Sequence, residues 1–169
     1  MVSTLSKEVL LKYKTNIFVE LGSSVGDGVQ VALDTGFDTV YTIEKDIKYY
    51  NITKNRYINN PNVICIHGDS VEELKNVLMS NPVKLTIWMD AHNDGSCPIL
   101  KELDVIRMFS KNNNNILIDD MRMFGKREHE FITSEEIIRS IKDINVNYAI
   151  SYEPSVYGQY DILSAVIND

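Results

Sequence analysis

Short apolar runs rich in β-branched residues recur along the chain and are separated by polar turns. Seven such runs are visible: IFVEL, TVYTIE, NVICIHG, KLTIWMD, NILIDD, NYAISYE and DILSAVIN. Most of them are nearly continuous in apolar residues rather than alternating, which is typical of strands buried on both faces. The pattern therefore predicts seven strands and favours a parallel sheet.

Segments with helical spacing of apolar residues lie between these runs. The expected helices cover residues 27–35, 46–59, 70–80, 98–110 and 133–142. Pro98 suits a first helical turn, and Thr133 offers a capping hydroxyl followed by acidic residues. The last two runs are joined by PSVYGQY, which is too short for a crossover helix. We therefore expect an α/β fold with a mostly parallel seven-stranded sheet and an antiparallel last strand.

Length and composition describe one globular domain. The chain has 169 residues, 44% of them apolar and 24% charged, and no apolar run approaches the roughly 20 residues that span a membrane. We expect a single domain over residues 1–169. The start, MVSTLSKEVLLKYKTN, lacks the long apolar region of a secretory signal. The expected location is the cytoplasm, without a membrane partner.

The charge balance argues against nucleic acid as a partner. There are 17 Lys and Arg against 24 Asp and Glu, whereas binding to a phosphate backbone needs clustered cations. A local cluster at Arg122, Lys126 and Arg127 is interpreted as a solvated loop. Cys65 and Cys97 have no Cys or His neighbour at metal-ligand spacing, so both are expected to be free thiols.

A glycine-rich loop, LGSSVGDG, follows the first predicted strand. Gly22 directly follows the strand, and Gly26 and Gly28 open the next helix, so the backbone can approach a ligand at a helix N-terminus. Glu44 ends the second strand, where an acidic side chain accepts hydrogen bonds from ribose hydroxyls. Either feature alone also has a structural interpretation, as a tight turn or a helix-terminal carboxylate. Together they indicate a nucleotide-like ligand, although the glycine spacing is not the dinucleotide fingerprint.

Glu20 narrows the choice of ligand. A carboxylate at the end of IFVEL would repel a pyrophosphate but would suit a positively charged ligand, and S-adenosylmethionine carries an ammonium and a sulfonium. Three features bear on this choice: the E-x-G-x-x-x-G-x-G loop, the acidic residue Glu44 at the ribose-binding position, and Asp69-Ser70 after the third strand. In these three features the chain resembles class I S-adenosylmethionine-dependent methyltransferases. The resemblance extends from about residue 16 to residue 168.

This resemblance implies a Rossmann-like three-layer sandwich and a set of cofactor-binding residues. The implied set comprises Glu20, Gly22, Ser23, Gly26, Gly28, Glu44, Asp69, Ser70 and Asp90. More narrowly, WMDAHNDG and ILIDDMRMFG resemble a group of small methyltransferase-like proteins that carry D-A-H after the fourth strand and I-D-D after the fifth.

Three carboxylates after the fourth and fifth strands resemble the divalent-cation site of metal-dependent O-methyltransferases. They are Asp90, Asp119 and Asp120. The resemblance implies Mg²⁺ bound by oxygen ligands and water, which would lower the pKa of a substrate hydroxyl. In the alternative interpretation, Asp119 and Asp120 cap a loop and Asp90 contacts the methionine part of the cofactor.

His92, two residues after Asp90, is the candidate general base, because an imidazole titrates near neutral pH. The other histidines have no comparable context: His67 would line the adenine side at most, and His129 is expected at the surface. Three tyrosines within the predicted helix 46–59, Tyr49, Tyr50 and Tyr57, are interpreted as core residues.

The expected function is S-adenosylmethionine-dependent transfer of a methyl group to an oxygen of a small molecule or sugar, with His92 and Asp90 as catalytic residues. The fourth strand is followed by DAHN rather than the (D/N)-P-P-(Y/F) of amino methyltransferases resembling this fold. Because the sheet carries no insertion, we expect a large acceptor or a second subunit, as in a homodimer, to close the site. Two alternatives remain: a non-catalytic cofactor-binding module and a nicotinamide-dependent oxidoreductase.

Overall fold

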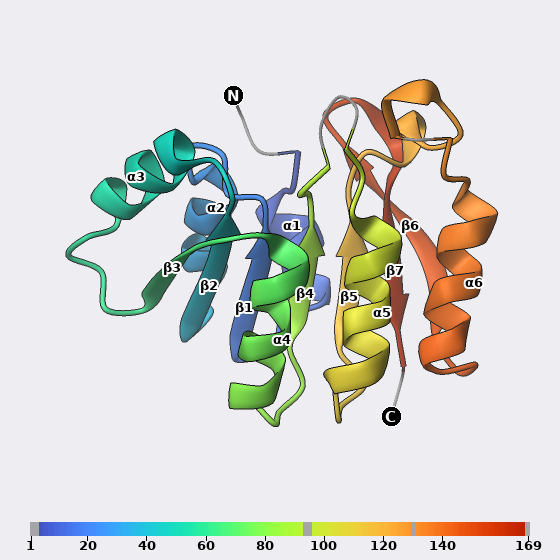
Figure 1. The fold of residues 1–169 in the computed structure, drawn as a ribbon, viewed down its shortest axis with the longest axis horizontal. Helices are drawn as coiled ribbons and strands as arrows, with labels where there is room; N and C mark the ends of the chain where they lie inside the picture. The colour runs from blue at the N-terminus through green and yellow to red at the C-terminus, as the bar shows by residue number, and fades with distance from the viewer. Residues whose placement is uncertain (1–3, 93–95, 130, 168–169) are drawn as a thin grey trace.

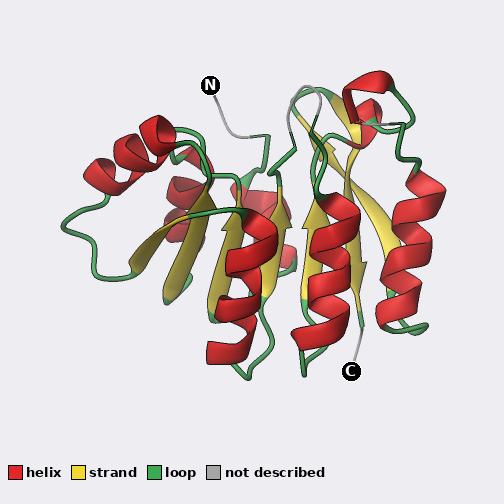
Figure 2. Cartoon of the chain, viewed as in Figure 1, coloured by secondary structure: helices red, strands yellow, loops and turns green. Residues whose placement is uncertain are grey.

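The structure is a computed structural model that describes residues 4–92, 96–129 and 131–167. Its strands are β1 (Ile17–Leu21), β2 (Thr39–Glu44), β3 (Val63–His67), β4 (Thr86–Met89), β5 (Asn115–Ile118), β6 (Ala149–Ser155) and β7 (Gly158–Val166). Its α-helices are α1 (Lys7–Lys12), α2 (Asp27–Thr35), α3 (Ile47–Arg56), α4 (Ser70–Ser80), α5 (Ile99–Phe109) and α6 (Ser134–Ile144). Two short 3₁₀ helices, η1 (Met121–Met123) and η2 (Arg127–His129), follow β5. Figure 2 shows how helices and strands alternate.

The seven strands form one sheet in the order β3-β2-β1-β4-β5-β7-β6. Strands β1 to β5 are parallel, whereas β7 is antiparallel to both β5 and β6. This confirms the predicted mostly parallel sheet and the terminal hairpin. The order reverses between β1 and β4, and such switch points are where open α/β sheets bind ligands.

Helices cover both faces of the sheet and complete a three-layer sandwich. Figure 1 shows α4, α5 and α6 on the near face, with α1 and α2 behind the strands. The near-face core includes Leu74, Leu103 and Ile137, and the far-face core is built around Phe18 and Trp88. Strand side chains buried on both faces explain the continuous apolar runs in the sequence.

Local capping signals fix where the helices begin. Asp46 and Asp69 cap α3 and α4 through their carboxylates, and Thr133 forms a capping box with Glu136 at the start of α6. The sequence does not predict α1, which Ser6 caps and which buries Val9 and Leu10 on the far face of the sheet. None of the helices in the described ranges has both the length and the apolar character needed to cross a membrane.

The structure corrects the interpretation of the three tyrosines. Tyr57 is buried, but Tyr49 is 38% exposed and Tyr50 is half-buried. Tyr50 stacks on His67, with ring centroids 5.0 Å apart. Because α3 packs on an edge strand, one side of the helix stays open to solvent. The Cys65 thiol is free, as predicted, and Cys97 is buried.

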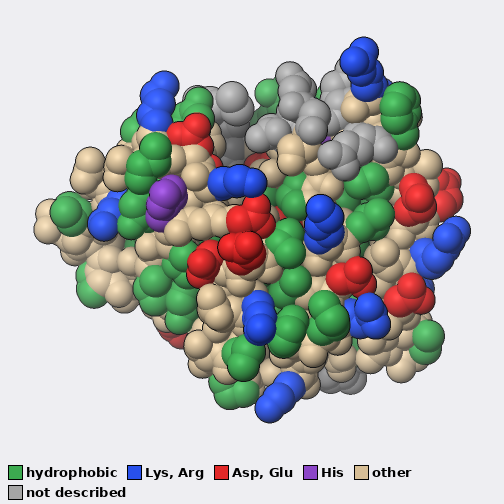
Figure 3. Space-filling view, in the orientation of Figure 1, with side chains coloured by type: hydrophobic (Ala, Val, Ile, Leu, Met, Phe, Trp, Pro, Cys, Tyr) green, Lys and Arg blue, Asp and Glu red, His purple; other side chains and the backbone are tan. Residues whose placement is uncertain are grey.

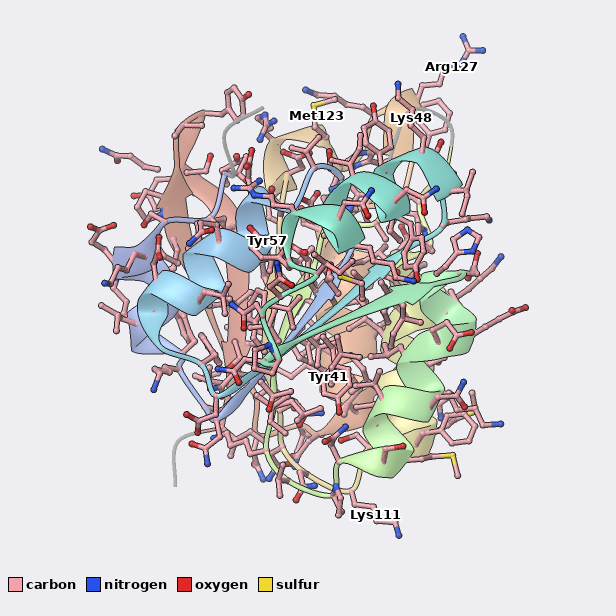
Figure 4. All side chains as sticks on the ribbon, turned by 90° about the vertical axis from the view of Figure 1, so that its left-hand side faces the viewer. Tyr41, Lys48, Tyr57, Lys111, Met123 and Arg127 are labelled. Carbon is pink, nitrogen blue, oxygen red and sulfur yellow. The ribbon has the colours of Figure 1, made fainter. Side chains whose placement is uncertain are left out.

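Basic and acidic side chains are interspersed on the molecular surface. On the face shown in Figure 3, acidic side chains gather near the centre with Lys and Arg around them. In Figure 4, Arg127 projects outward beyond the loop after β5. Lys126 is also exposed, whereas the partly exposed Arg122 is engaged in ion pairs with Asp120 and Asp161. The three cations therefore do not form one patch.

Candidate functional site: a cavity at the carboxyl ends of the strands

A cavity of about 160 Å³ lies where β1, β4 and β5 end. It is bounded by the glycine loop, by the acidic residues after β4 and β5, and by the turn between β6 and β7. Its lining consists of Thr4, Glu20, Gly22, Ser23, Ser24, Val25, Asp27, Gly28, Asp90, Asp119, Asp120, Arg122 and Tyr157. The cavity thus brings together most of the residues predicted to bind a cofactor or metal.

The glycine loop depends on a close approach of two backbones. Gly22 has a φ of +91°, and a Cβ there would lie 2.4 Å from the carbonyl oxygen of Asp90. Gly26 is the N-cap of α2 and also has a positive φ, of +83°. A side chain at Gly22 would separate the loop from β4 or collide with it. The loop therefore passes directly beside the strand that carries Asp90.

Three side chains from α3 and its C-terminal end hold the loop in place. Thr53, Arg56 and Tyr57 donate to the carbonyls of residues 24, 25 and 26, at 3.0, 2.9 and 2.7 Å respectively. Figure 4 shows Tyr57 between α2 and α3. Three consecutive carbonyls are thus bound from one side, which fixes the backbone of the loop against α3. No sequence pattern predicted this contact, because it joins segments about 30 residues apart.

Glu44 and Ser23 occupy the two sides of the loop. The Glu44 carboxylate accepts from the backbone N–H of Ser24 and of Asp46, each at 2.9 Å. Ser23 is 4% exposed, and its hydroxyl has no hydrogen-bond partner within the described residues. A buried hydroxyl without a partner is costly, so this oxygen is suited to a polar ligand in the cavity.

Glu20 is buried under the loop at the end of β1. Burial raises its pKa from 4.5 to about 8; the hydrogen bond donated by Thr42 acts in the opposite direction, while the charges of Glu44 and Asp27 add to the increase. Without a ligand, Glu20 is therefore largely protonated at neutral pH. A cation beside it would favour the ionised carboxylate.

The three aspartates after β4 and β5 differ in their protonation. Burial, followed by the charges of Asp119 and Asp120, raises the pKa of Asp90 well above its usual value. Burial also raises the pKa of Asp119 to about 6, although Thr4 donates a hydrogen bond to its Oδ2. The pKa of Asp120 is lowered, because interactions with His92 and Arg122 outweigh the effect of burial. The cluster has more negative charge than its neighbouring cations balance.

His92 lies behind this cluster rather than in open solution. Its side chain is 2% exposed, and its Nε2 is 3.5 Å from Asp120 and 3.9 Å from Asp90. One ligand atom from each of Asp90, His92 and Asp120 lies within 4.8 Å of the others, a spacing that could hold a metal ion. Asp119 instead forms such a group with Asp120 and Asp161. The predicted trio Asp90, Asp119 and Asp120 thus shares one cavity, but its members fall into two different candidate sets, one completed by His92 and the other by Asp161.

His129 is buried next to His92, so the expectation of a surface position is wrong. It is 4% exposed, and its ring lies edge-on to His92 with centroids 4.5 Å apart. Phe124 contacts both imidazoles. The charged residues around His129 predicted a surface position. Its burial results from the path of η2 back toward the end of β4, which no local sequence pattern indicates.

Asp69 and Ser70 lie at the end of β3, on the side expected for adenine. Asp69 caps α4 and forms an ion pair with Lys45 at 2.9 Å, which contributes to the lowering of its pKa. Ser70 is buried and donates its hydroxyl to Glu102 on α5. Neither residue lines the cavity described above. Their role toward a cofactor stays a prediction.

Arg122, which the sequence analysis assigned to a solvated loop, and Tyr157, which it did not single out, also line the cavity. The Arg122 guanidinium lies 2.6 Å from Asp120 and also pairs with Asp161. The Tyr157 ring stacks on it, with the guanidinium carbon 4.2 Å from the ring centroid. The turn between β6 and β7 is thereby anchored to the acidic cluster.

The same arrangement of strands occurs in solved methyltransferase structures. One is the O-methyltransferase from Bacillus cereus in complex with SAH, 15% identical with a TM-score of 0.65, over 96% of this chain and 78% of that chain. Another is a SAM-dependent methyltransferase from Aquifex aeolicus, 16% identical with a TM-score of 0.62, over 96% and 88% of the two chains. This chain has the class I methyltransferase fold. The O-methyltransferase TomG from Streptomyces achromogenes, in complex with SAM, matches at 11% identity and a TM-score of 0.60, over 96% and 78%.

The sequence comparisons give no match: no family model fits the chain, and no curated protein matches it. At 11% to 16% identity the structural likeness concerns the fold. In the class I methyltransferase fold, the cavity at the ends of β1 and β4 occupies the switch point where ligands bind. Fold and cavity thus agree on the place of a site, and its chemistry must be argued from the side chains.

Proposed function

We propose that the protein is an S-adenosylmethionine-dependent methyltransferase that methylates a hydroxyl oxygen of a small-molecule acceptor with the help of a divalent cation. The observation that carries this proposal is the acidic cavity beside the glycine loop, with the buried hydroxyl of Ser23 lacking a partner within the described residues. The cavity is placed at the switch point of a sheet whose solved neighbours include methyltransferases in complex with SAM or SAH.

The residues fit a cationic, nucleoside-containing cofactor. Glu20 and Asp90 supply carboxylates whose pKa values would fall toward ionisation beside an ammonium or sulfonium. Gly22 leaves room for a close backbone approach, and Ser23 offers a buried hydroxyl. The Glu44 carboxylate would accept hydrogen bonds from the ribose hydroxyls, either in place of its present backbone donors or in addition to them. The cofactor, when bound, supplies a methyl group activated by positive sulfur.

The residues also fit a divalent cation. Asp90 and Asp120 provide carboxylate oxygens of the kind that Mg²⁺ prefers, and one oxygen of each lies within 4.8 Å of the other. His92, whose Nε2 lies within the same spacing, is kept as the proton acceptor. A bound cation would act as a Lewis acid toward the acceptor hydroxyl. Asp119 lines the same cavity and would bind a water of the ion or join its ligands.

Methyl transfer forms a carbon–oxygen bond, breaks a carbon–sulfur bond and releases one proton from the acceptor hydroxyl. In this proposal the carboxylates would hold the cation, and the proton passes to His92, whose Nε2 lies 3.5 Å from Asp120. Asp90, 3.9 Å from the same nitrogen, orients the acceptor. Most of the rate acceleration would come from positioning the acceptor oxygen in line with the methyl group.

The first test is calorimetric titration of S-adenosylmethionine and, separately, NAD into the purified protein, with and without Mg²⁺. We expect micromolar affinity for S-adenosylmethionine and a loss of at least about tenfold in Glu44→Ala, because a charge-assisted hydrogen bond contributes about 1.5–3 kcal/mol. The matched control is Glu135→Ala, an exposed carboxylate on α6. Absence of binding, or tighter binding of NAD, would contradict the proposal.

The second test separates an enzyme from a binding module. Tritiated S-adenosylmethionine is offered with a panel of hydroxylated small molecules, and transfer of the label is measured. Asp90→Asn and His92→Ala should abolish transfer while cofactor binding stays measurable. Cofactor binding without transfer to any acceptor in the presence of Mg²⁺ would favour a non-catalytic module.

A further inference from the structure

A second, larger hollow lies next to the acidic cavity. Its volume is about 600 Å³, within the range that binds drug-sized molecules. It is enclosed by the segment before α1, the first half of α2 and the end of β6. Leu5, Val31, Pro154 and Val156 provide apolar walls from these three segments. We call this hollow the α2–β6 groove.

The α2–β6 groove carries little net charge. Its charged lining residues are Asp27 and Arg56, which form an ion pair at 2.7 Å and so neutralise each other. Thr4, Ser6, Gln30 and Ser155 add neutral polar groups. This composition contrasts with the neighbouring cavity, where carboxylates prevail. An anionic or cationic ligand would find no unpaired countercharge among the described residues of the groove, whereas a neutral apolar group would gain burial there.

The groove and the acidic cavity are adjacent. Thr4 and Asp27 line both, so these two side chains stand between the hollows. Thr4 is held there by the hydrogen bond that it donates to Asp119. The opposite wall is fixed as well, because Ser155 donates to Asp161 and accepts from the N–H of Tyr157 at 3.0 Å. Both walls are thus tied to the edge of the site where transfer would occur.

We infer that the α2–β6 groove binds the body of the acceptor, and that this body is uncharged and largely apolar. This inference rests on the proposed function, because the acidic cavity supplies the reacting end. The acceptor hydroxyl would enter the acidic cavity while its apolar body lies along Leu5, Val31 and Val156. Free sugars and phosphorylated metabolites are then poor acceptors, since they would bury polar or charged groups against apolar walls.

The direct test uses a neutral apolar fluorophore, N-phenyl-1-naphthylamine, as a probe of the groove. We expect saturable binding with a blue-shifted emission, and at least a tenfold loss of affinity in Val156→Asp. Val156 is 69% exposed, so this variant should fold. The matched control is Val146→Asp, which is 74% exposed and lies in the turn between α6 and β6. Its affinity for the probe should stay within twofold of the unmodified protein.

A second variant, Val31→Trp, fills the groove from α2 and should weaken probe binding by a similar factor. Absence of saturable binding, equal effects of both aspartate variants, or displacement of the probe by S-adenosylmethionine would overturn the inference. A change from dimer to monomer in Val156→Asp would also overturn it, because the groove would then be a contact between copies of the chain. The affinity for S-adenosylmethionine, measured by calorimetry on the same variants, should stay within twofold of that of the unmodified protein. A failure of the proposed function, seen as absent cofactor binding, is thereby distinguished from a failure of this inference.

Discussion

Glu102 offers the sharpest test of the electrostatics derived from the structure. This carboxylate lies in the first turn of α5, 1% exposed, and accepts a hydrogen bond from Ser70. Burial raises its pKa from 4.5 to about 7, although Ser70 and His92 act in the opposite direction. Since one pKa unit corresponds to about 1.4 kcal/mol, ionised Glu102 destabilises the fold by about 3 kcal/mol.

The sign follows from proton binding. Between pH 4.5 and 7 the folded state retains the Glu102 proton that the unfolded state loses, so stability falls as pH rises through this window and then levels off. Glu102→Gln keeps the shape and can still accept from Ser70, but it never ionises. The stability advantage of this variant over the unmodified protein should therefore grow by about 2 kcal/mol between pH 5.5 and pH 8.5.

Urea unfolding measures this difference directly. The single tryptophan, Trp88, is buried in the far-face core and reports unfolding by its fluorescence. Glu135→Gln, at an exposed position on α6, is the control and should show a difference that hardly changes with pH. A pH-independent difference for Glu102→Gln would refute the reasoning, because it would mean that Glu102 is already ionised at pH 5.5 in the folded protein.

Three further substitutions test the local geometry. Gly22→Ala should destabilise the fold by at least about 2 kcal/mol, because φ at this position is +91° and the alanine Cβ would meet the Asp90 carbonyl. An unfolding temperature within 1 °C of that of the unmodified protein would contradict this prediction. Tyr57→Phe leaves the Gly26 carbonyl without its side-chain donor and should lower the free energy of unfolding by about 1 kcal/mol. The affinity for S-adenosylmethionine should fall as well. Unchanged affinity in calorimetry would show that the loop keeps its conformation without this hydrogen bond. Thr133→Ala removes a capping box and should cost about 1 kcal/mol in urea unfolding, whereas Ser134→Ala, one residue later, should cost only a few tenths; equal losses would argue against the cap.

The sequence predicted the sheet well because its signals are local. Continuous apolar runs such as KLTIWMD mark strands buried on both faces, and the short PSVYGQY link leaves no room for a helix before the last strand. The start of α6 was equally legible from the capping residue Thr133, whereas the caps at Asp46 and Asp69 were not singled out. Helix α1 was missed because it is only six residues long and shows no full apolar period.

The site was only partly predictable, since much of it depends on contacts between distant segments. The glycine loop and Glu44 could be found from their spacing around successive strands. The hydrogen bonds from Thr53 and Tyr57 to the loop could not be predicted from the sequence. The burial of His129 beside His92 could not be predicted either. These contacts depend on how α3 and the loop after β5 fold over the sheet, and no periodicity in the sequence encodes that path.

The raised pKa values and the proposed ligands are two aspects of the same arrangement. Glu20 and Asp119 are buried and Asp90 is crowded between them and Asp120, so ionising these carboxylates without a ligand weakens the fold. A cation in the cavity removes this penalty, and the free energy recovered contributes to its binding. Arg122 relieves only part of the repulsion, because its guanidinium is already shared between Asp120 and Asp161. The cavity therefore favours positively charged ligands, and under the proposed function the α2–β6 groove beside it, whose charged residues pair with each other, would favour a neutral body for the acceptor.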